Sequence, residues 1–184
     1  MAVALTATIY NFDIDLADTD RGVYETLALR VARHPSESED YLLTRVLAYT
    51  LEYVDGIEFS SGGLSNPDDP AITVKDLTGA MRAWIEVGTP DADRLHRASK
   101  VSPRVAVYVH KDPTQFLGRL AGERIHRASA LEIYAVDRAL LADVVSRLGR
   151  RMNFSLSVTD RELCLSIGPD TFTGSIARVA HVTT

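Results

Sequence analysis

Two carboxylates in the middle of the chain have the chemistry of a divalent-cation site. Glu86 lies near the end of the apolar segment Met81–Gly88, and in a strand its side chain shares one face with Trp84. Asp76 stands ten residues before Glu86. Magnesium takes oxygen ligands and retains several waters, so two or three convergent carboxylates are enough to bind it. A bound ion can polarise a phosphodiester and activate a water molecule. These residues therefore predict Mg²⁺ or Mn²⁺ as cofactor.

The chain between these carboxylates decides whether they meet. Residues 72–75 and 81–87 have the pattern of two strands, and Asp76 begins a turn sequence, Asp-Leu-Thr-Gly, between them. A strict hairpin leaves Asp76 at the turn and Glu86 at the far end, so convergence requires splayed strands or a later turn. Asp69, in a proline-bounded loop, is the alternative second carboxylate, although aspartates in such loops commonly serve the turn itself.

Charge is distributed unevenly along the 184 residues. The net charges are −11 over residues 1–93, +7 over 94–151 and −1 over 152–184, which sum to −5. A basic segment of this kind can mark a surface for a polyanion such as nucleic acid. The acidic and basic parts of one fold can equally complement each other, and both interpretations stay open at this point.

Several classes of protein are excluded by what the sequence lacks. The first fifteen residues do not have the basic-then-apolar layout of a signal peptide, and no apolar run approaches the roughly 18 to 20 residues of a membrane-spanning helix. We therefore expect a cytoplasmic protein with no membrane partner. Cys164 is the only cysteine, which excludes an internal disulfide and a cysteine-rich zinc site. No glycine-rich phosphate loop, nucleophile elbow or Rossmann fingerprint is present.

The spacing of apolar residues predicts one α/β domain over residues 1–184, with β-hairpins at both ends. The expected strands are 3–16, 23–33, 57–60, 72–75, 81–87, 104–109, 129–136, 154–158 and 163–167. The expected helices are 37–54, 90–102, 113–124 and 137–150. The first helix should begin at a capping box with Ser36 as N-cap and Glu39 at N3. Strands that alternate with helices indicate a mixed, partly parallel sheet covered by helices.

Four segments carry a resemblance to a known family. They are Ala-Arg-His-Pro-Ser-Glu at 32–37, Lys-Asp-Leu-Thr-Gly at 75–79, Trp-Ile-Glu-Val-Gly at 84–88 with Pro90, and Arg-Leu-His-Arg-Ala-Ser-Lys at 94–100. In this order and spacing, and over nearly the whole chain, they resemble the YaeQ family, a variant of the PD-(D/E)xK, restriction-endonuclease-like fold. The resemblance implies a core of helix, three-stranded meander, helix and strand.

The same resemblance implies roles for individual residues. Glu37 would be the carboxylate of the first helix, and Asp76 and Glu86 would be the two acidic residues of the signature, with the carbonyl of Val87 completing the metal shell. The family of folds places a lysine two residues after the second acid, and this chain has Gly88 there.

A glycine cannot supply a charge. Some members of the wider superfamily take the missing cation from the following helix, so the resemblance implies a cation there. Lys100 is the expected substitute, with Arg97 as alternative, three residues away on the same helical face. Arg94, Arg97 and Arg104 should guide a nucleic-acid backbone. The expected function is a Mg²⁺-dependent phosphodiesterase acting on nucleic acid. The alternative, favoured by Gly88, is a catalytically inactive module of this fold that binds protein or nucleic acid.

Overall fold

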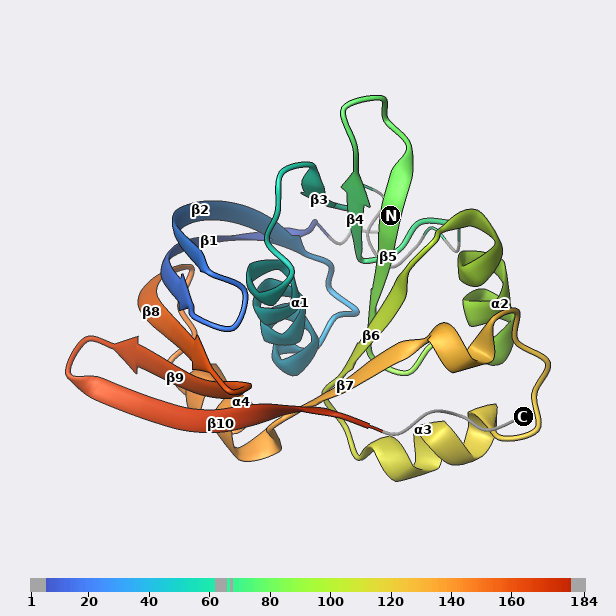
Figure 1. Cartoon of the computed structure of the whole chain (residues 1–184). Coiled ribbons are helices and arrows are strands. Elements are labelled where there is room, and N and C mark those ends of the chain that lie inside the picture. Colours follow the sequence, from blue (N-terminus) through green and yellow to red (C-terminus); the bar gives the residue numbers. More distant parts are fainter. Residues whose placement is uncertain (1–5, 62–65, 67, 180–184) are drawn as a thin grey trace, which may run out of the picture.

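The computed structural model describes residues 6–61, 66 and 68–179. Within these residues, ten strands form one mixed sheet in the order β2-β1-β8-β9-β10-β7-β6-β5-β4-β3. The sheet curls until it is nearly closed, and helix α1 (Glu39–Leu51) lies inside the curve (Figure 1). The expectation of a mixed α/β fold is confirmed. Among the described residues, no helix has both the length and the apolar character that crossing a bilayer requires.

The N-terminal strands form a long hairpin. β1 (Thr8–Asp18) and β2 (Val23–Arg33) pair antiparallel along their whole length, as the sequence predicted. Every second side chain of β1 is buried, including Phe12 and Ile14, because strand side chains alternate between faces. On its other side β1 pairs parallel with β8 (Arg151–Thr159), so the two ends of the chain meet in one sheet.

Helix α1 is buried on nearly all sides because the sheet curls around it. Its buried residues Leu42, Leu43, Val46 and Leu47 join one apolar cluster with side chains from both halves of the sheet. A helix that is apolar around most of its circumference belongs inside a core. The predicted N-cap, Ser36, was wrong by two residues: Ser38 is the N-cap, and its hydroxyl accepts a hydrogen bond from the Tyr41 amide at 3.1 Å.

The central strands run in a meander and then cross over. β3 (Ile57–Phe59), β4 (Ile72–Lys75) and β5 (Met81–Val87) are antiparallel, and α2 (Ala92–Val101) leads into β6 (Val105–Val109), which pairs parallel with β5. α2 and α3 (Pro113–Leu120) cover the other face of β5 and β6, where a second apolar cluster gathers around Trp84, Leu95 and Phe116. Both faces of the central strands are therefore buried.

The C-terminal part completes the sheet. A short 3₁₀ turn, η2 (Ala128–Ala130), precedes β7 (Glu132–Val136), which lies parallel to β6, and α4 (Arg138–Val145) then packs beside α1. The remaining strands are β9 (Glu162–Ile167) and β10 (Asp170–Arg178). The sequence did not predict β10, which pairs with both β9 and β7 and so joins the two halves of the sheet.

Candidate functional site

A cavity of about 490 Å³ opens where α1 begins and where β5 and β6 end. The carboxyl ends of these two parallel strands lie side by side, so residues that follow each strand reach the same space. Six charged side chains line the cavity: Glu37, Arg45, Asp69, Glu86, Arg94 and Lys111. Three of them are acidic and three are basic. The lining therefore offers ligands for a cation and partners for an anion in one place.

Glu86 is the most buried acidic side chain of this cavity after Glu37, and it is held by two donors. Its Oε1 atom accepts hydrogen bonds from the Trp84 indole Nε1 at 2.6 Å and from Arg94 Nε at 2.7 Å. Trp84 can reach it because residues two apart share a strand face. Burial raises the pKa of Glu86 above its usual value, and the contacts with Arg94 and Trp84 oppose that rise.

Asp69 is tied to the same arginine. Arg94 lies in the first turn of α2, where its amide donates to the N-cap Asp91 at 2.7 Å, and its Nη2 atom donates to the Asp69 carbonyl at 2.6 Å. The pairing of Ile72 with Ile85 explains the proximity, because it places the chain before β4 at the sheet end that carries Glu86. Arg94 thus links the loop before β4 to the end of β5.

Glu37 enters the cavity from the segment before α1. The Arg45 guanidinium donates to Glu37 Oε2 at 3.0 Å and to the Ala32 carbonyl at 2.8 Å, and Arg33 Nε donates to the Glu37 carbonyl at 2.9 Å. These bonds fix the turn between β2 and α1. Burial raises the pKa of Glu37, although Arg45 lowers it in part. Glu37 therefore reaches the site as expected, but from the loop and not from the first turn of the helix.

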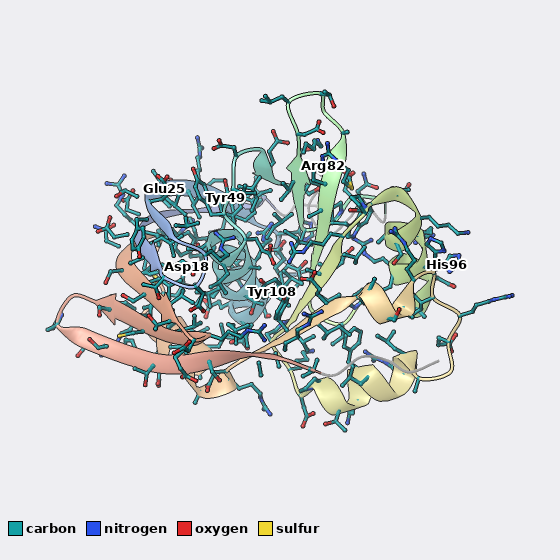
Figure 2. The ribbon with its side chains drawn as sticks, in the orientation of Figure 1. Asp18, Glu25, Tyr49, Arg82, His96 and Tyr108 are labelled. Carbon is teal, nitrogen blue, oxygen red and sulfur yellow. The ribbon has the colours of Figure 1, made fainter. Side chains whose placement is uncertain are left out.

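Asp76 does not meet Glu86, which corrects the expected convergence. It lies in the turn of the β4–β5 hairpin, where its carboxylate accepts hydrogen bonds from Thr78 and Ala80 and pairs with Arg82 at 2.5 Å. Figure 2 labels Arg82 on this hairpin, which projects from the body of the molecule. The hydrogen bond from the Thr78 hydroxyl, with the others in the turn, lowers the pKa of Asp76 to about 2. Asp69, the alternative carboxylate, takes its place in the cavity.

Of the four basic residues expected at the site, one lines the cavity and three do not. Arg94 lines the cavity, whereas Lys100 and Arg97 are exposed on α2 and do not line it. Arg104 is engaged elsewhere: its guanidinium donates to both carboxylate oxygens of Glu52 and to both of Glu132. Lys100 is thus not positioned to replace the missing lysine at Gly88. Arg104 thus cross-links Glu52, at the C-terminal end of α1, to Glu132 in β7.

Comparison with known proteins gives the chain its family. The sequence model described as "YaeQ protein" matches residues 3–175. The chain belongs to the YaeQ family. Relatives described as "Uncharacterized protein YaeQ" in Salmonella typhi and Escherichia coli (strain K12) are each 29% identical over 165 residues, covering 89% of this chain and 91% of theirs.

Solved structures of the same family share the fold described above. The crystal structure of YaeQ protein from Pseudomonas syringae superposes with a TM-score of 0.84 at 29% identity, covering 97% of each chain. The structure of YaeQ protein from Xanthomonas axonopodis pv. citri gives a TM-score of 0.80 at 28% identity, covering 95% of this chain and 99% of that one.

The backbone conformation at Gly88 disfavours a lysine at this position. Gly88 has a φ of +92°, a conformation that L-residues rarely adopt. A Cβ atom at this position would lie 3.6 Å from the Tyr41 ring and 3.8 Å from His110. The space is therefore sufficient for a small side chain, and the backbone conformation is the obstacle. Tyr41 and His110 occupy the region into which a side chain at this position would extend.

Three further residues of the cavity were not found from the sequence. Tyr41 and His110 contact each other edge to face, with ring centroids 6.1 Å apart, and Lys111 follows His110 directly. Lys111 could have been found, because it stands just after a buried strand that runs parallel to the strand of Glu86. Tyr41 could not have been found in this way, because a tyrosine at the start of an apolar helix is expected to be part of the hydrophobic core.

The donors of the cavity are compatible with a hard divalent cation. Mg²⁺ is commonly bound through one or two carboxylates, with waters and substrate phosphates supplying the other ligands. Asp69, Glu86 and the Val87 backbone line one space and offer oxygen atoms of this kind. Within the described part of the chain, no three histidine, cysteine or acidic side chains are grouped closely enough to hold a metal. The arrangement therefore fits a site with two carboxylates, Asp69 and Glu86, and not a cluster of three acidic side chains among the described residues.

Proposed function

We propose that this protein is a metal-dependent phosphodiesterase that acts on nucleic acid. The observation that carries the proposal is the convergence of Asp69 and Glu86 on one cavity, with Arg94 bonded to both residues. The order of elements supports it: α1, the meander β3-β4-β5, α2 and then β6 parallel to β5 is the order expected of a restriction-endonuclease-like core. In that core, the acidic pair stands at the ends of the two central meander strands.

Asp69, Glu86 and the Val87 carbonyl are the residues that would hold Mg²⁺ or Mn²⁺. A bound ion would supply Lewis acidity, polarising the scissile phosphodiester and lowering the pKa of a bound water. The protein's own part is to place the carboxylates. Arg94 and the Trp84 indole hold the Glu86 Oε1 atom, which fixes the orientation of that carboxylate.

Lys111 is the cation that we assign to the substrate. It lines the cavity, its side chain is exposed, and it makes no ion pair with any of the described residues. Arg94 and Arg45, in contrast, are already bonded to Glu86 and Glu37. A flexible ammonium group beside paired carboxylates can neutralise charge that develops on a phosphate during cleavage. Lys111 thus takes the role that the sequence suggested for Lys100.

A second candidate function is a catalytically inactive module of the same fold that binds nucleic acid or protein. Gly88 favours this candidate because no lysine follows Glu86. The ion pairs Arg45–Glu37 and Arg94–Glu86 favour it as well, because a carboxylate that is engaged by an arginine binds a metal less readily. The two candidates differ in whether metal binding depends on Asp69 and Glu86. They are therefore separable by one titration.

The test is calorimetric titration of Mn²⁺ and Mg²⁺ into the wild type and three variants. Asp69→Asn and Glu86→Gln remove ligand charge with little change of shape, whereas Asp76→Asn makes the same change on an aspartate outside the cavity. We expect the wild type and Asp76→Asn to bind the metal equally and the other two to bind at least about tenfold more weakly. The same proteins are then incubated with single- and double-stranded DNA and RNA. Equal heats in all four proteins, with no cleavage of any substrate, contradict the proposal.

A further inference from the structure

Arg94 bridges the two acidic residues that are assigned to the metal. Its Nε atom donates to Glu86 Oε1 at 2.7 Å, and its Nη2 atom donates to the Asp69 carbonyl at 2.6 Å. All three residues line the cavity. The Asp69 carboxylate itself accepts a hydrogen bond from the uncharged Asn66 amide at 2.8 Å. One guanidinium therefore stands between two acidic residues, in the region where the ion would be bound.

The ion pair between Arg94 and Glu86 is the more open of the two arginine–glutamate pairs that line the cavity. Its side chains are 21% and 5% exposed, whereas those of Arg45 and Glu37 are 5% and 1% exposed. Breaking a fully buried pair is costly, because each charge is left without water as well as without its partner. Arg94 is partly exposed, so water can solvate its guanidinium once the pair opens. Of the two arginines, Arg94 is thus the one that can leave its glutamate at the lower cost.

A metal ion and the guanidinium of Arg94 oppose each other at Glu86. Mg²⁺ binds carboxylate oxygens at about 2.0 to 2.1 Å, so an ion on Glu86 would lie close to a guanidinium whose Nε atom is 2.7 Å from Oε1. Two positive charges at such a separation repel each other strongly where little water screens them. The Trp84 indole also donates to Oε1, at 2.6 Å, and it is uncharged. Glu86 therefore keeps one of its two donors when Arg94 leaves.

We infer that Arg94 competes with the metal ion for Glu86 and limits metal affinity until it is released from that carboxylate. The inference rests on the proposed function, because it concerns the same ion at the same two acidic residues. The ion pair neutralises Glu86 in the metal-free protein, and metal binding exchanges one cation for another. The released guanidinium still belongs to the lining of the cavity, where a phosphate of the substrate can accept its hydrogen bonds.

The test is calorimetric titration of Mg²⁺ into the full-length wild type, Arg94→Gln and Arg97→Gln. Both substitutions remove one positive charge from α2, but Arg97 is exposed and does not line the cavity. The titrations are made at about pH 8, because contact with Arg94 lowers the pKa of Glu86 and its loss would otherwise favour the protonated acid. We expect Arg94→Gln to bind Mg²⁺ at least about tenfold more tightly than the wild type, and Arg97→Gln to bind as the wild type does.

A second measurement uses only the wild type, so it does not depend on the folding of Arg94→Gln. The Nε–H group of Arg94 is bonded to Glu86 and should exchange slowly with water, which gives a resolved ¹H–¹⁵N signal in the metal-free protein. We expect this signal to be lost as Mg²⁺ saturates the site, because the released group exchanges its proton with water. The Nε–H group of Arg104, bonded to Glu132 at 3.0 Å, is the control and should keep its signal.

The outcomes separate this inference from the proposed function. Equal or weaker Mg²⁺ binding by Arg94→Gln overturns the inference, and so does an Arg94 Nε–H signal that persists at saturating Mg²⁺. Metal binding that depends on Asp69 and Glu86 but not on Arg94 contradicts only the inference. Tighter binding by Arg94→Gln, without cleavage of any nucleic acid, contradicts only the proposed phosphodiesterase. Absence of Mg²⁺ binding in both the wild type and Arg94→Gln overturns both.

Discussion

The Nε atom of Arg94 lies 2.7 Å from Oε1 of Glu86, and this pair joins the first turn of α2 to the end of β5. The Glu86 side chain is 5% exposed and that of Arg94 is 21% exposed. Arg94 also lies over the Trp84 ring, with its guanidinium carbon 6.0 Å from the ring centroid. Arg94, which is partly exposed, thus balances the negative charge of the buried Glu86 carboxylate.

Arg94→Gln should destabilise the protein by about 3 kcal/mol, because it leaves the buried Glu86 carboxylate without its cation. The value lies at the low end for buried pairs, since Arg94 is partly exposed and water can replace some of the lost interaction. Urea unfolding at neutral pH measures the difference. Arg97→Gln is the control on the same helix: Arg97 is exposed, and its loss should change stability by no more than about 0.5 kcal/mol. Equal effects of the two substitutions would contradict this account of the pair.

Most of the fold could be predicted because its strands and helices have clear apolar periodicity. Strands β2, β4 and β5 were predicted with the observed bounds, and the crossover through α2 with its parallel strand followed from the alternation of elements. The closing strand β10 escaped prediction because its sequence, Asp-Thr-Phe-Thr-Gly-Ser-Ile-Ala-Arg, has few apolar residues and a glycine in its middle. Its place in the sheet is set by pairing with β7 and β9, which is a tertiary interaction that local sequence does not contain.

The site was predicted less well than the fold, for a reason visible at Asp76. Its turn sequence was recognised, and a regular hairpin already implied separation from Glu86. What local pattern could not supply was the cation, because Lys111 and Glu86 come together only through the parallel pairing of β5 with β6. The sequence shows directly that glycine, and not lysine, stands two residues after Glu86. The positive φ that makes a lysine unfavourable at this position is visible only in the structure.

The stability of the protein should depend on pH through Glu86. Burial raises the folded-state pKa of this carboxyl above 4.5, so between that value and the raised pKa the folded protein binds the proton that the unfolded chain has lost. The penalty for ionising Glu86 is therefore absent below about pH 4.5 and complete above the folded pKa. Relative to Glu86→Gln, which cannot ionise, the wild type should lose stability as the pH rises above about 4.5 and through the raised folded-state pKa.

Urea unfolding of both proteins across this range measures the difference. Glu37, whose pKa is also raised by burial, contributes equally to the two proteins and cancels in the comparison. A stability difference that stays constant with pH, or that grows in favour of the wild type as pH rises, would show that Glu86 is not held in an environment that disfavours its charge.

Arg104→Gln should destabilise the protein by about 2 kcal/mol. Arg104 bonds to Glu52 and Glu132 at distances of 2.6 to 3.0 Å, and the Tyr108 hydroxyl donates to the same Glu52 at 2.7 Å. Figure 2 labels Tyr108 in the middle of the molecule, and its side chain is buried. Removing the guanidinium leaves two carboxylates without a cation, and the partial exposure of Arg104 moderates the cost.

The same substitution tests the nucleic-acid role that the sequence suggested for Arg104. Its stability is compared with that of Lys100→Gln, an exposed change that should cost no more than about 0.5 kcal/mol. If Arg104 contacted phosphates, its removal would lower the salt dependence of DNA binding. We expect that dependence to stay the same, because all three guanidinium nitrogens of Arg104 already donate to the two glutamates.

Gly88→Ala and Gly118→Ala should change stability in opposite directions. At Gly88 the φ of +92° makes any L-residue strained, so alanine should cost about 1 to 2 kcal/mol even though its Cβ would meet Tyr41 and His110 only at ordinary contact distances. Gly118 lies in α3 with nothing near its Cβ position, and alanine there should stabilise the helix by up to about 1 kcal/mol. Chemical denaturation of the two variants and the wild type measures both signs. A neutral Gly88→Ala would mean that the backbone at the end of β5 can relax, and a lysine at this position would then be compatible with the fold.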